Sequence, residues 1–282
     1  MSTNRFSTLD PAHIDTTRAA LHDYARVLGD LLKECRTQRK HWWHASLRPS
    51  LNGLTTGVVS AAVDFELELD LRNSLLEMRA ATDARSSEPL RGQSAQSIRE
   101  SVREFLTALG IESGGNAARG GGEAPAPEHP GYSAEAAQQI GESFGAVNAS
   151  MVEFRSGIRE ETSPIQVWPH HFDLSMVWLP GERIPGQDPA DGENADKQMN
   201  FGFTLGDDAI PNPYFYVTAY PLPDALPELP VPEGTSWNTT GFSGALLHYH
   251  DLLETPDPAT FLLGWWRGLL AAGHEHMLGG DS

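Results

Sequence analysis

Residues 64–71 read Asp-Phe-Glu-Leu-Glu-Leu-Asp-Leu, so acidic and apolar side chains alternate along this stretch. A period of two is typical of a β-strand with one buried face and one face in solvent. The acidic row is therefore expected to face solvent. A turn at Arg72-Asn73 leads into a second run, residues 75–80, and the two runs predict an antiparallel hairpin.

The rest of the chain predicts further strands and several amphipathic helices. The first helix is expected to begin near Asp10-Pro11 and to carry an apolar stripe as far as Cys35. Further helices are expected around residues 98–109 and 133–158 and from Asp257-Pro258 onward, with strands near 165–168, 172–179, 199–205 and 214–220. Because the strands occur in runs, we predict an α+β fold with a mostly antiparallel sheet and packing helices.

Residues 110–131 are rich in glycine, alanine and proline and contain little that could be buried, which is typical of a flexible linker. The predicted organisation is an N-terminal α+β half (1–112), a linker (113–131) and a C-terminal α+β half (132–282). Each half reads as helix, strands and helix, so two pseudo-repeated halves are one interpretation. One joint domain is the other.

Composition excludes some classes of partner. The chain has 282 residues and a net charge of −18, from 38 acidic and 20 basic side chains, which disfavours nucleic acid and anionic membrane surfaces. The single cysteine, Cys35, cannot form an intramolecular disulfide, and the first residues lack an apolar signal core. We expect a cytoplasmic protein whose oligomeric state is open.

The segment Trp168-Pro169-His170-His171-Phe172-Asp173 is the densest in chemistry. Imidazoles beside a carboxylate suit metal ligation or proton transfer. In an extended segment His171 and Asp173 would share one face while His170 points to the other. We therefore predict His171 and Asp173 as a catalytic pair. A hydrogen-bonded structural pair at a sheet edge is the alternative.

The remaining ligands of a metal would have to come from a distant part of the chain. The sequence His41-Trp42-Trp43-His44 supplies two more imidazoles. The predicted metal ligands are His171, Asp173, His170, His41 and His44. A divalent ion such as zinc or iron held there would activate water, and the reaction would be the hydrolysis of a small polar molecule.

Two readings without catalysis stay open. In the first, a non-catalytic module binds a small ligand in an aromatic pocket whose predicted lining is Trp42, Trp43, Trp168 and Tyr216. Alternation over residues 212–220 supports part of it, since Tyr214, Tyr216, Thr218 and Tyr220 would share one face. In the second, the chain is a structural or interaction protein. The sequence contains neither the His-Glu-x-x-His motif of zincins nor the Gly-x-Gly-x-x-Gly motif of dinucleotide-binding domains, and enzyme activity itself is left open.

The chain resembles a family of uncharacterised bacterial proteins, a domain of unknown function. The motifs that carry the resemblance are HWWH (41–44), GLTTG (53–57), WPHHFDL (168–174) and NPYFYVTAYP (212–221). The resemblance implies family membership without an assigned activity or catalytic residue. One departure is the sequence Ser-Trp-Asn-Thr-Thr-Gly at 236–241, where members are expected to carry histidines beside the tryptophan. If those histidines are ligands in the family, this chain lacks them, and this puts in doubt an activity that depends on them.

Overall fold

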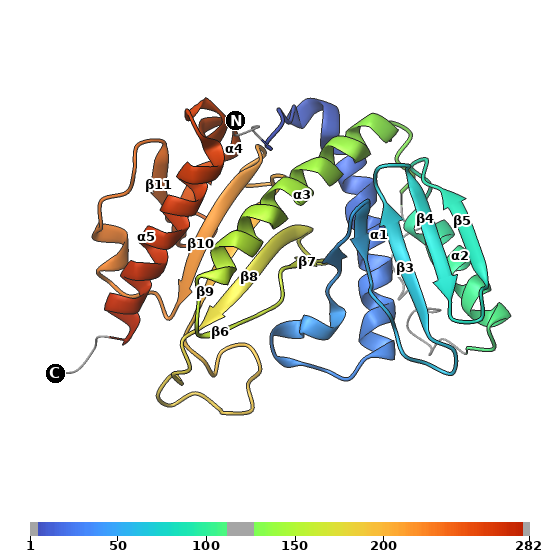
Figure 1. Cartoon of the computed structure of the whole chain (residues 1–282), viewed down its shortest axis with the longest axis horizontal. Helices are drawn as coiled ribbons and strands as arrows, with labels where there is room; N and C mark the ends of the chain where they lie inside the picture. Colours follow the sequence, from blue (N-terminus) through green and yellow to red (C-terminus); the bar gives the residue numbers. More distant parts are fainter. Residues whose placement is uncertain (1–4, 112–126, 279–282) are drawn as a thin grey trace. The chain divides into compact units, whose positions relative to one another are not determined.

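The computed structural model describes residues 5–111 and 127–278 of the chain (Figure 1). It contains two antiparallel sheets and several helices, which confirms the predicted α+β class. Most of the predicted linker, residues 113–126, lies outside the described residues.

The described chain forms two compact units. We call residues 12–145 together with 166–172 the N-unit, and residues up to Pro11 together with 146–165 and those from Asp173 onward the C-unit. The boundaries of these units differ from those of the predicted halves. The chain passes from one unit to the other inside the helix at residues 134–156, and residues 166–172 belong to the N-unit. The internal duplication stays a prediction.

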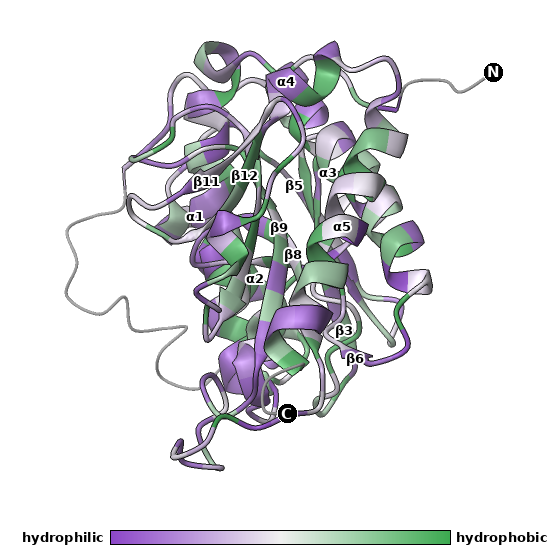
Figure 2. Ribbon diagram, turned by 90° about the vertical axis from the view of Figure 1, so that its left-hand side faces the viewer, coloured by the Kyte–Doolittle hydropathy of each residue, from purple (hydrophilic) through white to green (hydrophobic). Residues whose placement is uncertain are grey.

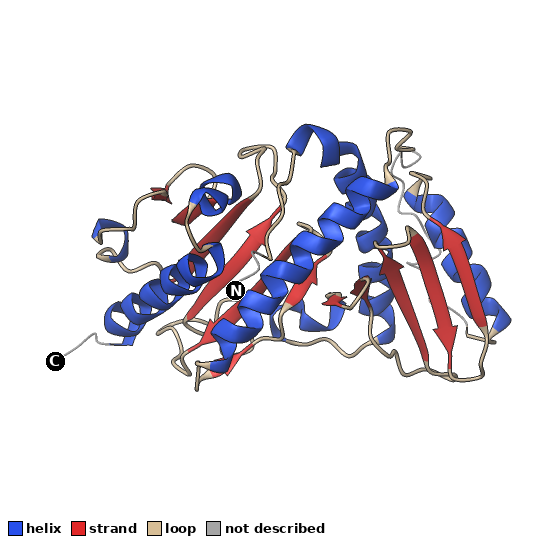
Figure 3. Ribbon diagram, turned by 45° about the horizontal axis from the view of Figure 1, so that its top comes forward, coloured by secondary structure: helices blue, strands red, loops and turns tan. Residues whose placement is uncertain are grey.

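The N-unit contains a meander of five short strands, in the order β1-β2-β3-β4-β5 with antiparallel neighbours (Figure 3). The strands are β1 (Arg48–Pro49), β2 (Gly53–Thr55), β3 (Phe65–Asp70), β4 (Leu75–Ala80) and β5 (Arg85–Pro89). The helical elements are α1 (Pro11–Cys35), the 3₁₀ helix η1 (Lys40–Ala45), α2 (Ala95–Ala108) and the part of α3 (Ala134–Ser156) up to Gly145. The predicted hairpin is confirmed, with Asp70 opposite Leu75.

Helices α1 and α2 lie against one face of the N-unit sheet (Figure 1). Five apolar residues of β3 and β4 that alternate along the strands are buried: Phe65, Leu67, Leu69, Leu76 and Met78. The short strand β7 (Gln166–Trp168) also belongs to this unit, where Val167 and Leu47 exchange backbone hydrogen bonds of 3.0 Å.

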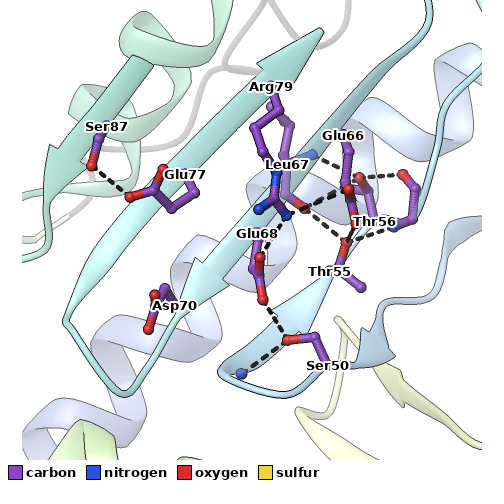
Figure 4. Close-up of polar contacts among 12 residues, drawn as sticks. Ser50, Thr55, Thr56, Glu66, Leu67, Glu68, Asp70, Glu77, Arg79 and Ser87 are labelled. Atoms are coloured by element: carbon purple, nitrogen blue, oxygen red, sulfur yellow. Dashed lines mark hydrogen bonds and ion pairs between the residues drawn. The ribbon is translucent and has the colours of Figure 1, made fainter. Parts of the chain in front are cut away.

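The acidic row of β3 is not simply solvent-facing, which corrects the prediction. Glu68 and Asp70 are only 6% and 5% exposed. Arg79 of β4 lies 2.7 Å from Glu68 and 3.4 Å from Glu66, and Ser50 donates a 2.6 Å hydrogen bond to Glu68 (Figure 4). Alternation marks these positions as polar, but it cannot distinguish a hydrated row from a buried network whose members satisfy one another.

The C-unit contains the larger sheet, whose strands run β11-β12-β10-β9-β8-β6 with antiparallel neighbours. They are β6 (Glu161–Thr162), β8 (Asp173–Leu179), β9 (Gln198–Thr204), β10 (Tyr214–Tyr220), β11 (Thr235–Asn238) and β12 (Gly244–His248). The unit also contains the C-terminal part of α3, the 3₁₀ helix η2 (Leu226–Glu228), α4 (Tyr249–Glu254) and α5 (Pro258–Leu278). The predicted start of the last helix is confirmed.

One face of the C-unit sheet is apolar and packs against α5 and the end of α3 (Figure 1). Phe154 of α3 contacts Phe201 of β9 and Trp266 of α5, with ring centroids 4.8 Å and 5.4 Å apart. In Figure 2, hydrophobic colouring runs along much of β8, β9 and β12. The opposite face carries the alternate residues of each strand, which are mostly polar. Within residues 5–111 and 127–278, no helix is both long and apolar enough to cross a bilayer.

The Arg79 contacts generate a stability prediction. Replacing Arg79 with Gln removes the charge that faces Glu66 and the buried carboxylate of Glu68, so the free energy of unfolding should fall by about 1–2 kcal/mol. The low end is expected because the Arg79 side chain is itself 37% exposed. Urea denaturation would measure this loss. The control is Arg72→Gln, at the exposed hairpin turn, which should change stability by less than about 0.5 kcal/mol, and equal losses in both variants would contradict the role of the network.

Candidate functional site

The histidine-bearing segment forms a tight turn after β7. The backbone N–H groups of His171 and Phe172 both donate to the carbonyl of Trp168, at 3.2 Å and 2.7 Å. Phe172 has a φ of 58°, in the left-handed region that residues other than glycine rarely adopt. The expected extended conformation is therefore wrong. Asp173 is the first residue of β8, whereas His171 lies in the turn before it. The two residues therefore do not share the face of one strand.

Within the N-unit, the turn rests on α1. Gly29 permits this contact, since a Cβ at that position would lie 2.6 Å from Cγ of Pro169. The imidazoles of His170 and His171 are exposed, with ring centroids 4.3 Å apart. Trp168 meets His170 edge-on at 5.9 Å. The turn thus presents the two predicted histidines side by side on the surface of the N-unit.

A third histidine, which the sequence did not single out, holds this turn from α1. His22 Nε2 lies 3.2 Å from the carbonyl oxygen of His170, so Nε2 carries the proton and donates. Its ring stacks on Phe172 at 5.7 Å. Burial and the nearby positive charge of Arg26 lower the pKa of His22 to about 4, so it is neutral near pH 7. His22 and Gly29 of α1 both face this turn. The sequence alone does not connect them, because the connection depends on where the turn lies.

The HWWH motif forms η1, a kinked 3₁₀ segment. His41 and Trp42 have φ values of 49° and 53°, again in the left-handed region. His41 and His44 are buried. The backbone N–H of Arg39 donates to His44 Nδ1 at 3.1 Å, which leaves Nε2 as the protonated nitrogen when the ring is neutral. The Trp42 ring stacks on His44 at 5.6 Å and stays 42% exposed.

The predicted metal ligands do not assemble. Among residues 5–111 and 127–278 no group of three or more histidine, cysteine, aspartate or glutamate side chains could hold a metal ion. This holds for the predicted set of His171, Asp173, His170, His41 and His44. Within the described parts of the chain, the imidazoles of His170 and His171 are a neighbouring pair without a third ligand.

The structure instead brings Asp173 together with Tyr216, inside the C-unit. Tyr216 of β10 reaches across β9, and its hydroxyl donates to Asp173 Oδ2 on β8. The Asp173 side chain is buried, with 6% of the residue exposed. Ser175, opposite Gly202 in the sheet, also hydrogen-bonds to the phenol. The sequence placed Asp173 in a catalytic pair and Tyr216 in a pocket, but it did not pair them.

Gly202 is what allows this arrangement. It lies between Ser175 and Tyr216 in the sheet register, and a Cβ at this position would overlap the Tyr216 ring. Burial, reinforced by the negative charge of Asp173, raises the pKa of Tyr216 well above its ordinary value. The phenol therefore stays protonated and acts as a fixed donor, which orients the carboxylate of Asp173.

A second phenol and carboxylate pair lies on the same face. Tyr214 donates a 2.6 Å hydrogen bond to Asp207 Oδ2, and its ring is 6.3 Å from that of Tyr216. Phe242 stacks on Tyr214 at 6.1 Å. The neighbouring rings confirm that alternate residues of β10 share a face, as the sequence predicted.

A family model matches residues 6–277 of the chain. The chain belongs to a family of unknown function (DUF5996). No curated protein and no solved structure matches it. This match confirms that the chain belongs to an uncharacterised family, as the resemblance in the sequence implied.

Membership of DUF5996 supplies no activity, so the roles of residues in this DUF5996 protein rest on geometry. The residues of the predicted aromatic pocket belong to two different units. Trp42, Trp43 and Trp168 belong to the N-unit, where Lys40 lies 5.3 Å above the Trp43 ring. Tyr216 belongs to the C-unit, where its partner is Asp173.

Gly202 generates the first site prediction. Gly202→Ala should lower the free energy of unfolding by about 2 kcal/mol or more, because the new methyl group displaces the Tyr216 ring from its place against Asp173. A double-mutant cycle with Tyr216→Ala measures the coupling, and the cost of Gly202→Ala should largely vanish in that background.

The matched control is Gly145→Ala in α3, where a Cβ meets nothing within 4 Å. Replacing a helical glycine that has free space around it with alanine should raise the free energy of unfolding by about 0.5–1 kcal/mol. An undiminished cost of Gly202→Ala in the Tyr216→Ala background would show that the ring is not what the methyl group displaces.

The lowered pKa of His22 generates a prediction about pH. The folded state resists protonation between the ordinary pKa of 6.5 and about 4, so the contribution of neutral His22 is complete above this window and is lost as the pH falls through it. In His22→Gln, the loss of free energy of unfolding between about pH 7 and pH 4.5 should shrink by roughly 1–2 kcal/mol, since the ring is only partly buried.

Denaturation curves at several pH values would measure this difference. His13→Gln, an exposed position on the same helix, is the control and should follow the wild-type pH profile. A His22→Gln profile parallel to wild type would contradict the assignment.

Proposed function

We propose that this protein binds a small polar molecule on the polar face of the C-unit sheet, with Asp173 and Tyr216 providing the central hydrogen bonds. The observation that carries the proposal is the buried carboxylate of Asp173 held by a protonated phenol. Burying a carboxylate is costly, and natural sites use such fixed groups to orient a ligand.

The exposure along β10 supports access to this face. Tyr214 is 4% exposed, Tyr216 and Thr218 are half-buried, and Tyr220 is 37% exposed. Asn200, the cross-strand partner of Thr218, adds a half-buried amide. A ligand approaching from the end of β10 would meet hydroxyl and amide groups before the carboxylate.

The charge of the face indicates what kind of ligand fits. The residues of β8, β9, β10, β11 and β12 that alternate with the apolar core include Asp173 but no lysine or arginine. The ligand is therefore neutral or positively charged, such as a polyol, a sugar, an amide or an amine, and an anion is disfavoured.

Metal-assisted hydrolysis, the other function predicted from the sequence, has weaker support. The described residues provide no group of three ligands, and Asp173 has Tyr216 as its hydrogen-bond partner. A catalytic role of Asp173 as an acid or base toward the bound molecule is compatible with binding on this face, and it would not need a metal.

A thermal-shift panel of sugars, polyols, amides and small amines tests the proposal. A binder at about 100 times its Kd should raise Tm by several degrees. The shift should be lost, with at least about tenfold weaker binding, in Asp173→Asn and in Tyr216→Phe, since each removes a charge-assisted hydrogen bond.

The control is Glu275→Gln, an exposed carboxylate on α5, which packs on the opposite face of the sheet, and this variant should bind as the wild type does. Binding that survives unchanged in Asp173→Asn would contradict the proposal, as would a panel without a binder. Stoichiometric zinc or iron in protein purified without a histidine tag, lost in a folded His171→Ala variant, would favour metal-assisted hydrolysis instead.

A further inference from the structure

Two half-buried arginines of the N-unit hydrogen-bond only to uncharged oxygens. Arg36 follows α1, and its Nη2 donates to the backbone carbonyls of Thr56 and Val58 at 2.6 Å and 3.2 Å. These carbonyls belong to the GLTTG turn and the residue after it. They fix the position of the guanidinium but do not neutralise it.

Arg48 of β1 is in the same situation. Its Nη1 donates to the Ser46 hydroxyl at 2.9 Å and to the side-chain oxygen of Gln166 at 2.5 Å. The single proton of the Ser46 hydroxyl can be donated to that oxygen, at 2.7 Å, or to the carbonyl of Trp43, at 2.9 Å. Because Arg48 can only donate, the amide of Gln166 is oriented with its oxygen toward the arginine. Gln166 is completely buried, and its Nε2 has no hydrogen-bond partner among the described residues.

Neither arginine has an ion pair with an aspartate or glutamate in residues 5–111 and 127–278. This is unexpected in a chain with 38 acidic and 20 basic side chains, where carboxylates are abundant. Arg79 in the same unit does have carboxylate partners. Half-burying a guanidinium without an anion is unfavourable, because the charge loses hydration and gains no counter-charge.

The two positive charges also act on each other. Burial and, to a smaller extent, the charge of Arg36 lower the pKa of Arg48 to about 10. Burial likewise lowers the pKa of Arg36. Burial, followed by the charges of Lys33 and Arg36, lowers the pKa of His44. In the sheet, Arg48 lies opposite Thr55, one residue before the carbonyl that accepts a hydrogen bond from Arg36.

We propose that Arg36 and Arg48 together bind an oxyanion, a carboxylate or phosphate group of a small molecule. A guanidinium has five N–H donors in a planar fork that matches such groups. The contacts of Arg48 described above use one nitrogen, and those of Arg36 also use one. The remaining donors can bind the oxyanion while the existing hydrogen bonds hold both side chains in place.

The proposed site brings together residues that lie in or beside three of the sequence motifs. Arg48 and Ser46 follow HWWH, the GLTTG turn holds Arg36, and Gln166 comes just before WPHH. The GLTTG turn lacks the lysine of a phosphate-binding loop. Arg36, the residue after α1, supplies a positive charge there instead. Gly57 has a φ of 63°, which lets the turn bend beside the Arg36 guanidinium, 3.9 Å from where a Cβ would lie.

Titration with inorganic phosphate and with succinate, against chloride at equal ionic strength, tests the proposal. Either oxyanion at about 100 times its Kd should raise Tm of the wild type by about 5 °C or more relative to chloride. Arg36→Gln and Arg48→Gln should each weaken binding at least about tenfold. Arg72→Gln, an exposed arginine of the same unit, should bind as the wild type does.

Gln166→Glu provides a test that does not depend on removing an arginine. The new carboxylate would face Arg48 where the amide oxygen now lies, and the amide nitrogen that is lost has no partner to forfeit. The variant should have a higher Tm than the wild type without oxyanion, and it should no longer respond to phosphate or succinate.

Two outcomes would overturn the proposal. One is a phosphate and succinate response no larger than that of chloride, or one retained in Arg48→Gln, which would indicate an adventitious ion only. The other is a Gln166→Glu variant with a lower Tm than the wild type, since Arg48 would then have no need of a counter-charge. The site lies in the N-unit and uses neither Asp173 nor Tyr216, so either result leaves the C-unit proposal intact.

Discussion

The hydrogen bond from Tyr216 to the buried carboxylate of Asp173 is the interaction on which the polar face of the larger sheet depends. The carboxylate starts β8, the phenol comes from β10, and the strand between them must carry glycine at position 202 for the ring to pass. Three adjacent strands are therefore fixed in register by one polar contact. A shift by one residue would place the ring in the apolar core and leave the carboxylate without its donor.

The two units use charge in opposite ways. In the C-unit, the carboxylate of Asp173 is buried and accepts a hydrogen bond from one phenol, on a face whose strands carry no arginine or lysine. In the N-unit, Arg36 and Arg48 are half-buried against carbonyl, hydroxyl and amide oxygens. Each arrangement retains a charge that a purely structural design could have replaced with neutral groups at lower cost. Both arrangements are the basis of the ligand sites that we propose.

The sequence predicted the secondary-structure elements but not the contacts around the candidate site residues, for a physical reason. The alternation at 64–71 and the apolar stripe of α1 are local patterns, so the strands, the hairpin and the helix starts could be inferred from them. The turn at His170 and His171 could not, because the left-handed conformation of Phe172 has no glycine to signal it. The partner of Asp173 lies 43 residues away, and no local pattern connects the two positions.

Arg36 illustrates the same limit most clearly. As the first residue of a basic cluster after α1, it looks like a cation placed to complement the helix dipole, and that explanation requires only solvent around it. The structure instead buries half of its side chain against two backbone carbonyls of a turn about 20 residues later. A dipole effect of about 0.3–1 kcal/mol at an exposed site cannot account for a guanidinium held away from water. What distinguishes the two explanations is that no carboxylate of the described residues forms an ion pair with Arg36, and only the folded chain reveals this.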